Sequence, residues 1–146
     1  MTKSVHPATL AVAVLLAGAS VTALHAQSFL DEIKAEHDPA RRSEKALLFA
    51  ENVFDSARDF YTKGDVHTGD ARLEDMTNAL NECVQSLEQA HKARFYKKAE
   101  LRVAYLQRRM KGLLDDIEMQ HRGWAEYTER KLDEIHDKLL DGVMRK

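Results

Sequence analysis

Apolar residues recur at alternating spacings of three and four along most of this chain, which is the spacing of one face of an α-helix. The clearest series is Leu73, Met76, Leu80, Cys83, Leu87 and Ala90. Similar series begin at Leu47, Tyr96 and Trp124, no proline follows Pro39, and the strong helix formers Ala, Leu, Glu, Lys and Arg are abundant. The sequence therefore predicts an all-α protein.

The signals that begin and end helices divide this pattern into an antiparallel bundle of about four helices. We expect them over roughly 39–63, 66–91, 95–119 and 123–141. Asp38 suits an N-cap and Pro39 the first helical position, while Gly64 and Gly142 suit the ends of the first and last helices. The connections are short, so consecutive helices are expected to run in opposite directions.

The region between the second and third helices allows two interpretations, because no Gly or Pro lies between Asp70 and Lys111. One continuous helix would place Arg94, Lys97 and Arg108 on the core side. The apolar series that begins at Tyr96 is shifted by two residues, which moves it to nearly the opposite face. We therefore favour a turn at about 91–94 over a single long helix.

The first 26 residues have the layout of a secretory signal peptide. Lys3 supplies the positive charge, 8–21 is an apolar run, and Leu24-His25-Ala26 or Val21-Thr22-Ala23 offers a small-residue cleavage site. We expect cleavage after Ala26 and export to the periplasm or beyond the cell, with an uncleaved membrane anchor as the alternative. A lead segment, 27–38, would then precede the bundle domain, 39–146.

Cys83 is the only cysteine, so it has no partner within the chain for a disulfide. Its place in an apolar series predicts that it is buried as a small hydrophobic residue, and a disulfide between two chains is the alternative. The pair of cysteines that attaches a c-type haem is absent. We expect no cofactor.

Two Glu-x-x-His motifs are the only candidates for a metal site: Glu88 with His91, and Glu118 with His121. Four-helix bundles hold di-iron centres with two such motifs and further carboxylates. Here the whole third helix, about 25 residues or roughly 35–40 Å, would separate them. We therefore expect no metal within one chain, although an antiparallel dimer could bring the motifs together.

A basic stretch occupies residues 92–112, which hold eight basic and one acidic side chain, whereas 27–90 hold seven basic and fourteen acidic. The basic side chains are Lys92, Arg94, Lys97, Lys98, Arg102, Arg108, Arg109 and Lys111. They could meet an acidic lipid surface or an anionic polymer. We favour a structural role beside the acidic helices, and the near-neutral total of −2 argues against nucleic acid.

No pattern in the chain indicates catalysis. We find no Gly-rich phosphate loop after a strand, no serine nucleophile elbow and no supported Cys–His pair. The apolar series also leave little room for a polar pocket. We expect a protein that is not an enzyme.

Tyr61, Gly64 and Asp65 define the expected turn between the first two helices. This Tyr-x-x-Gly-Asp pattern resembles the hairpin turn of tetratricopeptide repeats. The resemblance covers 46–80, about one repeat, and implies that an aromatic residue ends the first helix, Gly-Asp makes the turn and small residues on the second helix let the pair close. No second copy follows at a period of 34 residues.

Several short sequence patterns of the chain also resemble those of a group of exported bacterial proteins of unknown function. The matching features are the Tyr-x-x-Gly-Asp pattern, then Lys97-Lys98-Ala-Glu-Leu-Arg102, Arg108-Arg109 and His136-Asp-Lys-Leu-Leu140-x-Gly-Val-Met144. This resemblance implies an architecture and no activity.

Three functions fit these features. The first is an exported, non-catalytic bundle, monomeric or dimeric, that binds an unknown protein partner or has a structural role in the cell envelope. The second is a periplasmic chaperone-like helical dimer that binds unfolded clients, and the third is a metal-binding bundle. Membrane contact is expected only through an uncleaved signal segment or the basic helix.

Overall fold

The computed structural model describes residues 28–145, which are mostly helical and contain no strand. A helical segment at 28–34 comes first. It is followed by α2 (Pro39–Thr62), α3 (Val66–Ala90), α4 (Ala93–Asp116), the 3-10 helix η1 (Met119–His121) and α5 (Gly123–Met144). The expected signal peptide and its cleavage site lie outside the described residues. Among the described helices, none is long and apolar enough to cross a membrane.

The predicted antiparallel bundle is confirmed, and so is the break between the second and third helices. His91 has a left-handed backbone, with φ at 49°, and its N–H donates to the carbonyl of Leu87. After this turn α4 begins at Ala93. The phase shift in the sequence thus marks a real change of direction.

Side-chain caps begin the first two long helices. Asp38 accepts a hydrogen bond of 2.9 Å from the N–H of Ala40, and Asp65 accepts one of 3.2 Å from the N–H of Thr68. Between α2 and α3, Gly64 has φ at 79°, a conformation that glycine adopts without steric cost. The turn therefore closes within three residues, 63–65.

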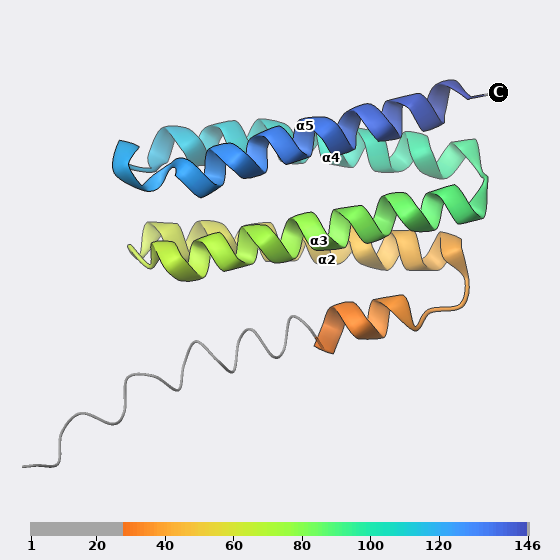
Figure 1. Cartoon of the computed structure of the whole chain (residues 1–146), viewed down its shortest axis with the longest axis horizontal. Helices are drawn as coiled ribbons and strands as arrows, with labels where there is room; N and C mark the ends of the chain where they lie inside the picture. The colour runs from red at the N-terminus through yellow and green to blue at the C-terminus, as the bar shows by residue number, and fades with distance from the viewer. Residues whose placement is uncertain (1–27, 146) are drawn as a thin grey trace, which may run out of the picture.

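The four long helices form two antiparallel hairpins stacked on each other (Figure 1). Within the hairpins, α2 packs on α3 and α4 packs on α5; between them, α3 contacts α5 and, less extensively, α2 contacts α4. Consequently, α3 and α4 are consecutive in the chain but lie diagonally across the bundle. The adjacent pairs α3–α5 and α2–α4 each run parallel, which the sequence did not predict.

The core follows the predicted apolar series closely, and Leu80 and Leu106 are fully buried. Two residues depart from the expectation. Trp124, expected in the last series, lies on the surface, and Gly142 does not end α5, which continues to Met144. Gly142 is instead buried inside the helix, where its missing side chain makes room for the ring of Tyr96.

The lead segment also joins this core. Leu30 and Ile33 of the helical segment 28–34 are buried with the residues of the long helices. Phe29 stacks on Phe49 of α2, with the ring centroids 4.9 Å apart. The segment therefore covers one side of the α2–α3 hairpin.

Candidate functional site: a groove between α3 and α5

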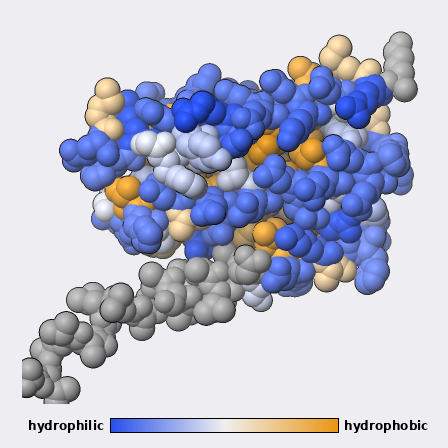
Figure 2. All heavy atoms as spheres, viewed as in Figure 1, coloured by the Kyte–Doolittle hydropathy of each residue, from blue (hydrophilic) through white to orange (hydrophobic). Residues whose placement is uncertain are grey.

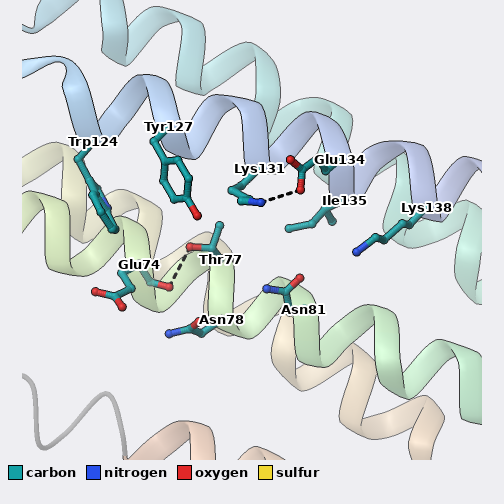
Figure 3. Close-up of a pocket in the computed structure, with 10 residues that line it drawn as sticks. All are labelled: Glu74, Thr77, Asn78, Asn81, Trp124, Tyr127, Lys131, Glu134, Ile135 and Lys138. Carbon is teal, nitrogen blue, oxygen red and sulfur yellow. Dashed lines mark hydrogen bonds and ion pairs between the residues drawn. The ribbon is translucent and has the colours of Figure 1, made fainter.

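An open groove of about 340 Å³ lies between the parallel helices α3 and α5. Figure 3 shows its lining from both helices. From α3 come Glu74, Thr77, Asn78 and Asn81, and from α5 come Trp124, Tyr127, Lys131, Glu134, Ile135 and Lys138. Most of these side chains are polar, and two aromatic rings stand at one end.

The aromatic end of the groove is formed by Trp124 and Tyr127, which are 39% and 41% exposed. Their ring centroids are 5.2 Å apart and the planes are tilted by 41°. The ammonium group of Lys131 lies 5.6 Å from the Tyr127 ring centroid, and Tyr127 stands between Trp124 and Lys131 (Figure 3). The spacing of these residues along α5, three and then four, places them on one helical face.

The charged end of the groove is internally paired. Lys131 Nζ lies 2.8 Å from Glu134 Oε2. This hydrogen bond raises the pKa of Lys131 and lowers that of Glu134, so both stay charged near neutral pH. With Glu74 and Lys138 added, the lining carries two acidic and two basic groups, and its formal charge is zero.

The α3 side of the groove offers unused hydrogen-bonding groups. The Thr77 hydroxyl lies 2.8 Å from the Leu73 carbonyl and 3.0 Å from the Glu74 carbonyl, its hydrogen-bond acceptors. The carboxamides of Asn78 and Asn81 make no hydrogen bond within residues 28–145. Each carboxamide has two donors and an acceptor oxygen available to a ligand.

The two asparagines also line a second hollow of about 340 Å³ on the other side of α3. The helical segment 28–34 forms its far wall through Leu30 and Lys34, and Glu82 and Gln85 complete the lining. Asn78 and Asn81 therefore stand on a ridge between two hollows. Figure 2 shows this face, where pale and orange spheres lie among blue ones in its middle part.

The candidate metal ligands are not brought together. Glu88 and His91 lie at the C-terminal end of α3, whereas Glu118 and His121 lie beyond the far end of α4, and all four are exposed. The 24 residues of α4 separate the pairs by about 36 Å. Among the described residues, no three His, Cys, Asp or Glu side chains are grouped so that they could hold a metal ion.

Part of the basic stretch forms a row of ion pairs with the acidic side of α2. Lys98 lies 2.6 Å from Glu44, and Arg109 pairs with Asp55. Arg102 Nε lies 2.7 Å from Glu51 Oε1, and a second guanidinium nitrogen of Arg102 pairs with the other carboxylate oxygen. These long side chains bridge the two helices where their backbones approach less closely. The structural role favoured from the sequence fits these three residues.

The other basic residues make local contacts or face solvent. Lys97 pairs with Glu100 within α4, at 2.9 Å. Lys92 and Arg94 lie over the ring of Phe95 at 6.0 and 4.7 Å, and Arg108 lies over Tyr105 at 5.6 Å. Lys111 is exposed. The basic stretch is thus divided between an inter-helix row and a scattered outer face.

The turn residues Tyr61, Gly64 and Asp65 form a structural unit. The Tyr61 ring lies 2.9 Å from the position that a Cβ on Gly69 would occupy, so glycine lets the two helices close. The Tyr61 hydroxyl donates to Asp70 Oδ1, and burial together with this bond raises the pKa of the phenol. These contacts fix the end of the hairpin and offer no open site.

Cys83 is a free cysteine in the core, with 1% of its surface exposed. Burial raises the pKa of its thiol to about 12, so the thiol is protonated near neutral pH. Thiolates, not thiols, act as nucleophiles and metal ligands. Cys83 therefore has a packing role, as its place in the apolar series predicted.

The groove was missed by the sequence reasoning, although two signals for it exist. Uncharged amides at Asn78, Asn81 and Gln85 recur at spacings of three and four on the polar side of a helix otherwise rich in charge. Trp124 and Tyr127 were assigned to the core or its margin. Only the parallel pairing of α3 with α5 brings these two sets of residues together.

Comparisons with known proteins leave the groove as the main guide to function. No protein family, curated protein or solved structure matches the chain.

Proposed function

We propose that this protein is a non-catalytic interaction module of the cell envelope and that the groove between α3 and α5 binds a protein partner. The single observation that carries the proposal is the combination of two free carboxamides, at Asn78 and Asn81, with the half-exposed rings of Trp124 and Tyr127.

The chemistry of the groove suits a protein surface. Aromatic side chains that are apolar over most of their area and polar at one edge are enriched at interfaces and often dominate binding energy. The formal charge of the lining is zero, so a strongly charged polymer gains no net attraction from it. A volume of about 340 Å³ is near the lower limit of ligand pockets, and suits a few side chains of a partner.

The ion pair between Lys131 and Glu134 in the groove supports a binding role over catalysis. General acid–base catalysis works best with a group whose pKa lies near the working pH. The Lys131–Glu134 pair moves both pKa values away from neutrality, because each group stabilises the charged form of the other. The pair is suited to orienting a partner.

Location in the envelope rests on the N-terminal sequence, in which Lys3 precedes the apolar run 8–21. Fractionation of the producing cells tests this part. We expect the protein in the periplasmic or culture fraction, with an N-terminus at Gln27. Recovery from the cytosol with Met1 retained would contradict it.

Quantitative capture with tagged protein tests the groove. Trp124→Ala and Asn81→Ala should each lower the yield of the co-purified partner at least tenfold, because interface anchors cost more than about 1.4 kcal/mol when truncated. Leu140→Ala, on the exposed side of α5, serves as the matched control. Equal yields from all three variants would place the partner elsewhere on the surface.

A further inference from the structure

The face formed by α2 and α4 carries two parallel rows of opposite charge. Glu44, Glu51 and Asp55 form the row on α2, and Lys98, Arg102 and Arg109 form the row on α4. The pairs join residues in the same order along both helices, which shows that the rows run parallel. In Figure 1 these two helices lie behind α3 and α5, so this face is opposite the groove.

Three exposed hydrophobic residues lie along the same rows. Leu48, Leu101 and Tyr105 are 54%, 56% and 52% exposed. Leu48 lies between Glu44 and Glu51, which pair with Lys98 and Arg102. Lys98 and Arg102, in turn, lie on either side of Leu101 in the basic row of α4. Leu48 and Leu101 therefore stand at the same level of the bundle, and Tyr105 follows one turn later.

We propose that this face binds a second copy of the chain around a two-fold axis that runs parallel to the helices. Rotation about such an axis leaves the height of every residue along the bundle unchanged. It also swaps the sides on which α2 and α4 lie, so α2 of one copy is placed over α4 of the other. Each acidic row then faces a basic row. Leu48 of one copy faces Leu101 of the other, because the two residues lie at the same height along the bundle. The face is complementary to itself.

The charge rows select this symmetry among the two-fold arrangements. A two-fold axis in the plane of the face but perpendicular to the helices would place α2 over α2 and α4 over α4. Acidic residues would then face acidic residues and basic would face basic, which costs binding energy. Only the axis parallel to the helices satisfies both the charge rows and the matched level of the leucines.

The size of the face suits a stable dimer. Two neighbouring helices of 24 residues present a rectangle of about 36 by 20 Å, which is roughly 700 Å² per copy. The total of roughly 1,400 Å² lies within the range of about 1,200–2,000 Å² that specific interfaces bury. The charged rows at neutral pH make the association dependent on ionic strength.

The dimer would hold two α3–α5 grooves on opposite outer surfaces. A partner that has two binding segments, or that is held in many copies within one layer of the envelope, would then bind both grooves at once. Linked sites of this kind raise the apparent affinity by about 10² or more. This consequence connects the dimer to the proposed function, whereas the dimer itself stands on the α2–α4 face alone.

Sedimentation equilibrium on residues 27–146 tests the oligomeric state. The dimer mass is expected at micromolar concentration, with dissociation favoured as NaCl rises. Leu101→Lys places an extra cation beside the basic row and should raise the dimer dissociation constant more than tenfold. Leu140→Lys, on the exposed side of α5, should leave it unchanged. A monomer at every concentration, or equal effects of the two variants, would overturn the proposal.

Mixed disulfide trapping tests the symmetry. Leu48→Cys and Leu101→Cys are made in separate chains, with the native Cys83 buried in both. Oxidising the mixture with dissolved oxygen joins two thiols by loss of two electrons and two protons to oxygen. The mixture should give a covalent dimer of one chain of each kind far faster than either variant alone. Equal rates in all three samples would contradict the parallel axis.

A groove variant separates this inference from the proposed function. Trp124→Ala should leave the sedimentation behaviour unchanged even if it abolishes partner capture. Loss of the dimer in that variant would show that the groove face, and not the α2–α4 face, joins the two copies.

Discussion

Gly142, in the last part of α5, lies directly against the ring of Tyr96, near the start of α4. A Cβ on Gly142 would fall within the space of that ring, and the residue is buried. Tyr96 is itself buried, so its ring has little freedom to move away. The open end of the α4–α5 hairpin therefore packs a glycine against an aromatic ring, and the turn end of the α2–α3 hairpin does the same with Gly69 and Tyr61.

Gly142→Ala should destabilise the protein by about 1–3 kcal/mol, because an added methyl group in a packed region forces neighbouring atoms to shift. Gly112→Ala is the control: nothing lies within 4 Å of a Cβ there, and the helix gains about 1 kcal/mol from replacing glycine. Urea unfolding followed by circular dichroism measures both. A Gly142→Ala variant as stable as Gly112→Ala would show that the space between position 142 and the Tyr96 ring can hold a methyl group.

Leu80→Asp and Leu106→Asp should each prevent stable folding. Both leucines are fully buried, and a carboxylate there would lack a partner, at a cost of more than about 4 kcal/mol. Leu140→Asp, on the surface, should keep the wild-type melting curve. Retention of full helicity and a cooperative melt in either core variant would show that the core lies elsewhere.

Glu100 should make the stability depend on pH. Its hydrogen bond to Lys97, with a further contact of 3.1 Å to His136, lowers the pKa of the carboxyl group. Its folded-state pKa lies below the unfolded value of about 4.3, so its stabilisation is present above that value and lost as the pH falls through the folded pKa. Glu100→Gln should therefore differ from wild type more at pH 7 than at pH 3.

Urea titrations at both pH values measure this difference. The exposed Asp115→Asn variant is the control for loss of a negative charge. A Glu100→Gln difference that is the same at pH 3 and pH 7 would show that the carboxylate contributes no pH-dependent stability.

Cys83 should resist alkylation in the native protein. The thiol is buried and its pKa is raised to about 12, so both access and the thiolate fraction are low. Maleimide labelling should proceed only at the rate of unfolding, and a cysteine placed at Leu140 should react at once. Rapid labelling of Cys83 in native protein would be incompatible with a closed core.

Much of the fold could be predicted because its signals are local. Asp38 and Asp65 begin helices with hydrogen bonds from their own side chains, and the change of phase around His91 reports the turn there. Each signal involves residues within one or two helical turns. The bounds of the four helices accordingly lie within a few residues of those predicted.

The arrangement of the helices depends on contacts between distant residues and was not predicted. Whether α3 neighbours α4 or α5 is decided by how the two hairpins stack, and the periodicity of each helix is compatible with either. The same limit hid the groove, because Asn81 and Trp124 are 43 positions apart. Gly142 was taken as a helix end for a related reason: its partner, Tyr96, belongs to another helix.

Photo-crosslinking in living cells tests partner binding in the groove most directly, with a photoreactive amino acid placed at Asn81 in the groove or at Leu140 outside it. We expect a crosslinked protein of one defined mass in the envelope fraction from position 81, removed by Trp124→Ala, and none from position 140. Crosslinks of equal yield from both positions, or none from position 81 while the protein is folded and exported, would contradict the assignment of the groove as the binding surface.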